Sequence, residues 1–174
     1  MSYIFEELAH AIDASCESQD EPALRSFLAQ IATMDRVHMS APERAAVAFY
    51  EANIFAALRE RIEAPTPAQW SQPLLEDEIR ALRLARGELA DQSTPELGND
   101  LKLRILTNLA NALNRCGRVV EAVELWDEVL TELPRFGMAM GNKALALYWH
   151  ARYMDDALEQ ALLLRMSYRT LSAA

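Results

Sequence analysis

Glycine is scarce in this chain of 174 residues: only five are present, and none precedes Gly87. Strand-like alternation of apolar and polar residues is almost absent as well. Both features disfavour folds built from strands and tight hairpins. Seven prolines are spread thinly, and the stretches between them are rich in Ala, Leu, Glu and Arg, which are strong helix formers. The composition therefore predicts an all-α protein.

Basic charge is in deficit, with 17 Lys and Arg against 26 Asp and Glu and a formal net charge of -9. This balance disfavours nucleic acid or an anionic membrane as the main partner. No apolar run approaches the roughly 20 residues that cross a bilayer. The acidic N-terminal stretch lacks the basic region of a signal or transit peptide. We therefore expect a cytoplasmic protein that does not bind membranes or nucleic acid directly.

Residues that could carry chemistry are few and scattered. The three histidines, His10, His38 and His150, have no second histidine or cysteine at a metal-ligand spacing. Cys16 and Cys116 are expected to be buried, reduced thiols, because both fall on helix-like segments far apart in the chain. No glycine-rich phosphate loop is present. The sequence therefore predicts no catalytic residues, no metal site and no cofactor.

Helical periodicity covers nearly the whole chain. Apolar residues recur every three or four positions and predict eight helices, at about 2–16, 22–34, 41–63, 74–91, 100–116, 118–133, 137–152 and 154–171. Ser40 and Glu43 have the spacing of a capping box at the start of the third helix. The proline-rich segment 64–73, which we expect Trp70 to hold against the body, and segment 91–99 are the main irregular connections.

The stretch 103–134, LRILTNLANALNRCGRVVEAVELWDEVLTELP, resembles a tetratricopeptide (TPR) repeat, a 34-residue helix pair. Small residues are expected where the two helices cross closely, and a glycine where the chain turns between them. An aromatic residue is expected to fill the space toward the next helix, and a proline to end the unit. The residues that match these positions are Leu109, Ala110, Gly117, Ala122, Trp126 and Pro134.

A second unit follows as FGMAMGNKALALYWHARYMDDALEQALLL, in which the small Ala157 arrives one residue late. A weaker match, AAVAFYEANIFAAL, would pair with the helix at about 74–91. We expect one compact domain, a short α-solenoid. Its parts are an N-terminal hairpin at 1–40, a degenerate pair at 41–99, a repeat at 100–136, and a second repeat with the C-terminal helix at 137–174.

Residues 45–165 also resemble the repeat region of bacterial TPR proteins that continue into a HEPN domain, an RNase-type fold. FGMAMGNKALALYW is the most distinctive part of this likeness. HEPN catalysis requires an Arg followed four to six residues later by His, and none of the three histidines has such an arginine. The resemblance therefore implies no ribonuclease activity for this chain.

In a TPR stack the first helix of each pair lines a concave groove, and the charge is segregated accordingly. Residues 101–120 hold four bases and no acid, whereas 121–132 hold five acids and no base. The groove-facing positions map to Asn53, Arg104, Thr107, Asn111, Asn114, Arg115, Asn142 and Lys143. Asn111 matches an asparagine that many TPR proteins use to bind a peptide, whereas Leu145 stands at that position in the second unit; Asn142 could alternatively bond to Asn108. We expect the partner segment to be extended or helical and acidic.

The C-terminal end carries more apolar surface than a terminal repeat normally shows. Tyr148, Trp149 and Tyr153 are expected to form core for the last helix; if exposed, they would form a docking surface. The last helix has no convincing polar cap, which favours either a homodimer through the C-terminal helices or a contact with a partner subunit.

Two function classes remain open on the sequence alone. The first is a protein-binding adaptor or regulatory subunit. The second is the recognition half of a two-part bacterial effector or defence system whose HEPN-like nuclease domain lies on another chain.

Overall fold

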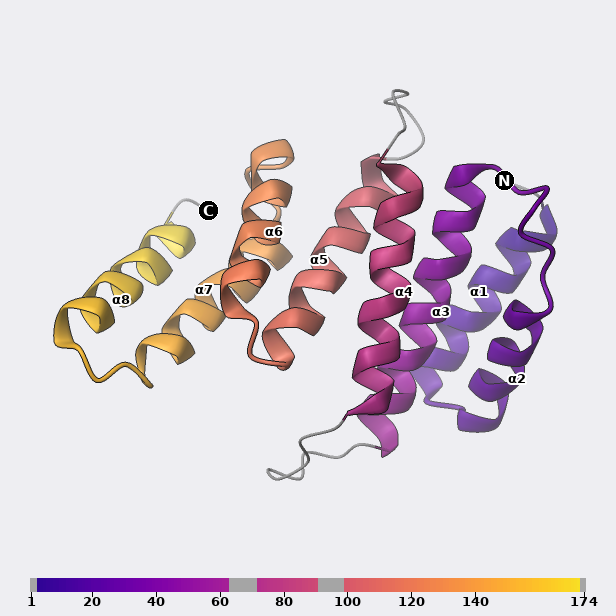
Figure 1. Cartoon of the computed structure of the whole chain (residues 1–174), viewed down its shortest axis with the longest axis horizontal. Helices are drawn as coiled ribbons and strands as arrows, with labels where there is room; N and C mark the ends of the chain where they lie inside the picture. Colours follow the sequence, from indigo (N-terminus) through magenta and orange to yellow (C-terminus); the bar gives the residue numbers. More distant parts are fainter. Residues whose placement is uncertain (1–2, 63–71, 91–98, 173–174) are drawn as a thin grey trace. The chain divides into compact units, whose positions relative to one another are not determined.

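The computed structural model describes residues 3–62, 72–90 and 99–172, and these residues form eight helices and no strand (Figure 1). The helices are α1 (Tyr3–Ser18), α2 (Glu21–Ala32), α3 (Ala41–Ile62), α4 (Pro73–Leu89), α5 (Asn99–Arg115), α6 (Val119–Glu132), α7 (Gly137–Ala151) and α8 (Ala157–Ser172). The prediction of an all-α protein is confirmed. Across these ranges, no helix is both long and apolar enough to cross a membrane.

Most helix boundaries lie within two residues of those expected, and α8 differs most. It begins at Ala157 instead of about residue 154. The side chain of Asp156 accepts hydrogen bonds from the backbone N–H groups of Leu158 and Glu159, at 2.8 and 2.9 Å, and so fixes the start of the helix. The expected irregular segments at 64–73 and 91–99 fall mainly outside the described residues, and Trp70 with them.

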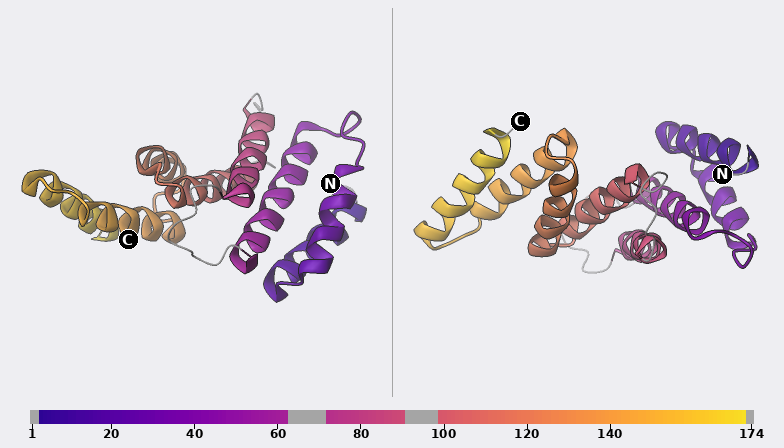
Figure 2. Two further views of the ribbon diagram at one scale, coloured as in Figure 1. Left: turned by 60° about the horizontal axis from the view of Figure 1, so that its bottom comes forward. Right: turned by 90° about the horizontal axis from the view of Figure 1, so that it is seen from above.

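Two compact units divide the chain, at Met1–Lys102 and Leu103–Ala174. In the first unit α1, α2 and α3 pack against one another, and α3 packs along α4 (Figure 2). The core of this unit joins side chains from α1, α2 and α3: Leu8, Ile12, Leu24, Ile31, Val47, Ile54, Ala57 and Leu58. Because α3 has neighbours on several sides, its buried residues are not confined to one stripe, and small alanines let those neighbours approach closely.

The start of α3 is fixed by the expected capping box. The backbone N–H of Ser40 donates to Oε2 of Glu43 at 2.9 Å, and the N–H of Glu43 donates to Oγ of Ser40 at 3.4 Å. The hydrogen bond from the Ser40 backbone, together with that from its hydroxyl, holds the pKa of the Glu43 carboxyl below its ordinary value. The capping-box prediction is confirmed.

In the second unit α6 packs against α7, and α7 packs along α8. The turn between α5 and α6 contains Gly117 at a φ of 81°, where a side chain would be strained. Its N–H donates to the carbonyl of Asn114 at 3.1 Å, while the N–H of Arg118 donates to that of Leu113 at 2.9 Å. Trp126 of α6 is fully buried in this unit.

Both cysteines are free thiols, but only one is sheltered. Cys16 on α1 is half-buried and its Sγ lies 3.7 Å from the carbonyl oxygen of Asn53 on α3. Burial, with a smaller contribution from Asp13, raises the pKa of the Cys16 thiol to about 11. Cys116 is exposed, so the expectation that it is buried is wrong. It lies just beyond the end of α5, beside the exposed turn at Gly117.

We expect iodoacetamide to label Cys116 readily at pH 8 and to label Cys16 in the folded protein only as the pH approaches 11. The reason is that the thiolate is the reactive form and that Cys16 stays protonated while folded. Since an ordinary thiol releases its proton near pH 9.0, stability should also fall as the pH rises from about 9 to about 11. Peptide mapping by mass spectrometry measures the labelling, and equal labelling of both thiols at pH 8 would contradict the structure.

A buried ion pair joins α3 and α4. Nε of Arg59 lies 3.0 Å from Oε2 of Glu78, and the side chains of the two residues are only 9% and 7% exposed. Removing one member of such a pair leaves a charge in a site with little water, whereas replacing both by apolar residues is often tolerated.

We therefore expect Glu78→Leu to lower the free energy of unfolding by about 3–5 kcal/mol, and Arg59→Leu/Glu78→Leu to recover most of that loss. Urea unfolding followed by circular dichroism measures both. Arg80→Leu is the matched control, because Arg80 is 76% exposed and pairs with Asp77 at the surface; its effect should stay below about 1 kcal/mol. A double variant no more stable than Glu78→Leu would contradict this account.

Candidate functional site

A hollow of the second unit lies along α5 and α7, with a volume of about 510 Å³. Its lining comes from α5, the turn before α6, α6 itself, α7 and the turn after it. The residues are Asn111, Asn114, Arg115, Gly117, Val119, Trp126, Asn142, Leu145, Ala146, Trp149, His150 and Tyr153. We refer to this hollow as the α5–α7 groove.

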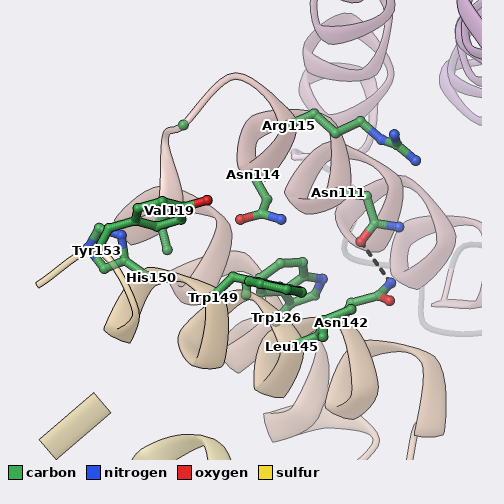
Figure 3. Close-up of a pocket in the computed structure, with 12 residues that line it drawn as sticks. Asn111, Asn114, Arg115, Val119, Trp126, Asn142, Leu145, Trp149, His150 and Tyr153 are labelled. Atoms are coloured by element: carbon green, nitrogen blue, oxygen red, sulfur yellow. Dashed lines mark hydrogen bonds between the residues drawn. The ribbon is translucent and has the colours of Figure 1, made fainter. Parts of the chain in front are cut away.

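One end of the α5–α7 groove is closed by a pair of amides. Nδ2 of Asn142 on α7 donates to Oδ1 of Asn111 on α5 at 2.8 Å (Figure 3). Figure 3 also shows Asn114 pointing into the hollow, while the guanidinium of Arg115 extends along the rim. The amide pair therefore joins the two helices directly.

The floor of the groove is aromatic. The indole of Trp126 is fully buried, and its Nε1 has no hydrogen-bond partner within the described residues. Trp149 also lines the groove, overlaps Trp126 in the view of Figure 3, and is 47% exposed. The ring of Trp149 contacts Tyr148 edge-on at 5.5 Å between centroids, and the guanidinium of Arg152 lies 5.2 Å from its centroid. These contacts hold Trp149 in place while leaving much of its ring accessible.

The far end of the groove is formed by Val119, His150 and Tyr153 (Figure 3). Tyr153 is 77% exposed, and Tyr148 is 40% exposed. The expectation that Tyr148, Trp149 and Tyr153 form core for the last helix is therefore wrong. Trp149 and Tyr153 line the α5–α7 groove, and their role as a docking surface stays a prediction.

Four residues expected to face a groove line this one: Asn111, Asn114, Arg115 and Asn142. The alternative that Asn142 bonds to Asn108 is not what the structure has, since its side-chain amide donates to Asn111. The remaining four expected residues lie elsewhere.

Thr107 was expected to face the groove, and it does not. It is 1% exposed, and its hydroxyl donates to the carbonyl of Leu103 one turn earlier at 2.7 Å, so its assignment to the groove is wrong. Arg104 is exposed on α5 but does not line the hollow. The ammonium of Lys143 pairs with the carboxylate of Asp127 on α6. Asn53 belongs to the first unit, where its backbone carbonyl accepts a hydrogen bond from the thiol of Cys16.

The histidines do not gather into a site. His10 and His38 lie in the first unit and are exposed, and His38 lies 3.7 Å from Asp35. His150 is half-buried and lines the groove. Over the described part of the chain, no three His, Cys, Asp or Glu side chains come close enough to hold a metal ion.

No family model, no curated protein and no solved structure matches the chain. The TPR and HEPN likenesses therefore remain interpretations of the residues themselves, and the geometry of the α5–α7 groove bears most directly on function.

We expect the Asn111–Asn142 hydrogen bond to show a coupling of about 0.5–1.5 kcal/mol in a double-mutant cycle on unfolding free energy. The cycle compares Asn111→Ala, Asn142→Ala and the double variant by urea unfolding. A parallel cycle with Asn114→Ala in place of Asn111→Ala is the control, because no Asn114–Asn142 bond is present, and its coupling should be near zero. Equal couplings in the two cycles would refute a specific bond between α5 and α7.

Proposed function

We propose that this chain is a protein-interaction module of the TPR type, and that the α5–α7 groove binds a segment of a partner protein. In this proposal α5–α6 and α7–α8 are successive repeat units, α3–α4 is a degenerate unit before them, and the chain itself catalyses no reaction. The groove is then lined by the first helices of two neighbouring units.

Several features of the second unit support the repeat assignment. Ala110 and Ala122, the small residues of the pattern, are both fully buried. Gly117 has the positive φ that the interhelix turn needs, and Pro134 lies two residues after Glu132, the last residue of α6. Trp126 fills space beside α7, as the pattern requires of its aromatic position.

The composition of the groove carries the functional proposal. It combines amide side chains, which can pair with the N–H and C=O groups of a peptide backbone, with the exposed rings of Trp149 and Tyr153. Aromatic side chains in a hollow are the usual anchors of protein interfaces. Because side-chain amides pair best with backbone groups that are not already bonded within a helix, an extended segment fits this groove best.

Charge indicates an acidic partner. The lining contains Arg115 and His150 but no Asp or Glu, although the whole chain carries a net charge of -9. Arg152 lies against Trp149 at its edge. A segment with Asp or Glu beside an apolar residue would place its carboxylate near these bases and its apolar side chain on Trp149.

Selection from a phage-displayed library of random peptides on the immobilised full chain tests the proposal. We expect enriched peptides to hold Asp or Glu next to an aromatic or aliphatic residue. A selected peptide, made synthetically with a fluorophore, should bind Trp149→Ala at least tenfold more weakly, because exposed aromatic anchors contribute about 2 kcal/mol or more. Fluorescence polarisation measures the affinity.

Arg115→Glu should weaken the same peptide about tenfold, because it reverses a charge in the groove lining. Arg104→Glu is the matched control: it lies on the same helix and makes the same charge change, but it lies outside the lining. If no peptide is enriched, or if Trp149→Ala and Arg115→Glu bind the selected peptide as the unaltered chain does, the groove is not the binding site.

A further inference from the structure

Helix α8 turns most of its apolar side chains toward solvent. The side facing α7 consists of Gln160, Leu163, Ser167 and Thr170, which are the less exposed residues of the helix. Oγ of Ser167 donates to the carbonyl of Ala144 at 2.8 Å, and Nε2 of Gln160 donates to that of Ala151 at 3.3 Å. Two side-chain hydrogen bonds therefore join this side of α8 to the backbone of α7, beside the half-buried Leu163.

The large apolar residues of α8 lie elsewhere on the helix. Leu158, Leu162 and Met166 are 69%, 51% and 45% exposed, and their spacing of four places them on one stripe turned away from α7. We call these three residues the outer stripe. A second group, Leu164, Tyr168 and Leu171, lies on the other flank of the α7-facing side and is also exposed.

The sequence of α6 shows that such a stripe is not needed for the helix pair itself. Positions 35 residues before Leu162 and Met166, the spacing that aligns Ala157 with Ala122, hold Asp127 and Thr131, and both are exposed. At these two positions α6 is polar and α8 is apolar, whereas the position that matches Leu158 holds the half-buried Val123. An apolar outward stripe of this kind marks a contact surface.

The order of acidic and basic residues along α8 indicates which kind of partner fits the outer stripe. Acids precede its centre and bases follow it: Asp155 and Glu159 near the start of the segment, Arg165 and Arg169 toward its end, all exposed. Two copies of α8 side by side and parallel would put like charges together. If the two copies are antiparallel, the acidic end of each α8 lies beside the basic end of the other. The two helix dipoles are then antiparallel too, which is favourable. The segment is thus complementary to itself.

We propose that α8 is a self-association surface, through which two copies of the chain pair antiparallel by their outer stripes. The twofold axis of this pair passes beside Leu164. Leu162 of one copy then lies opposite Met166 of the second copy, and Glu159 lies opposite Arg169. Such a contact is isologous, because each copy gives the same residues. A single helix pair buries little area compared with the roughly 1,200–2,000 Å² of stable interfaces, so the dimer is weak and reversible.

Sedimentation equilibrium of the full chain over protein concentrations from about 1 μM to about 1 mM measures the association. We expect the unaltered chain to shift from monomer to dimer and Leu162→Glu to remain monomeric throughout. Leu171→Glu is the matched control: Leu171 lies on the same helix and is 56% exposed, close to the 51% of Leu162, but it is not in the outer stripe. It should dimerise like the unaltered chain.

Charge reversal gives a second test that does not alter the apolar residues. Glu159→Arg and Arg169→Glu should each weaken association about tenfold, because each occurs twice in the symmetric pair. The double variant Glu159→Arg/Arg169→Glu exchanges the two signs and should recover most of the affinity. Circular dichroism establishes that each variant is folded.

The proposal is overturned if the unaltered chain is monomeric at every concentration, or if Leu162→Glu dimerises as strongly as Leu171→Glu. It is also overturned if the double reversal associates no better than the single ones, since only self-pairing makes the two changes compensate.

Discussion

The α5–α7 groove depends on how α7 is held against α5 and α6, and Trp126 is central to that constraint. Its indole is fully buried, so α7 must cover it, and the hollow forms above the covered ring. The Asn111–Asn142 hydrogen bond then joins α5 and α7 at one end. A large apolar contact supplies the attraction, and a directional polar contact fixes the position of one helix along the other. With these two contacts in place, Trp149 lines the groove and remains accessible.

Among the described residues, the buried Nε1 of Trp126 has no hydrogen-bond acceptor. A buried donor without an acceptor costs about 1–3 kcal/mol, and a phenylalanine would avoid that cost. In Figure 3 the indole nitrogen lies toward the side of the groove where Asn111 and Asn142 meet. Because this nitrogen is fully buried, an occupant of the groove does not reach it while α7 covers the ring, so the cost falls on the packing of the second unit.

Periodicity and capping residues predict most of the fold, because they act locally. The scarcity of glycine, the spacing of apolar residues and the Ser40–Glu43 box predict helices close to those observed. The partners of individual side chains depend on tertiary packing, which the spacing of apolar residues does not predict. Thr107 shows this: its position on the helix is compatible with a groove, but its side chain is buried and its hydroxyl bonds to the backbone. Lys143 likewise pairs with Asp127, which is sixteen residues earlier in sequence.

The aromatic residues near the end of α7 are the reverse case: the sequence pattern predicts that they are buried, and the structure has them exposed. Rings clustered at helical spacing are ordinarily core, because apolar side chains gain most by burial. α8 meets α7 through Gln160, Leu163, Ser167 and Thr170, and none of its residues lines the groove where Trp149 lies. Trp149 is therefore accessible on the side of α7 that lines the groove, and Leu158, Leu162 and Met166 lie on the outside of α8. The groove and the outer stripe share no residue. Each surface can be altered without changing the side chains of the other.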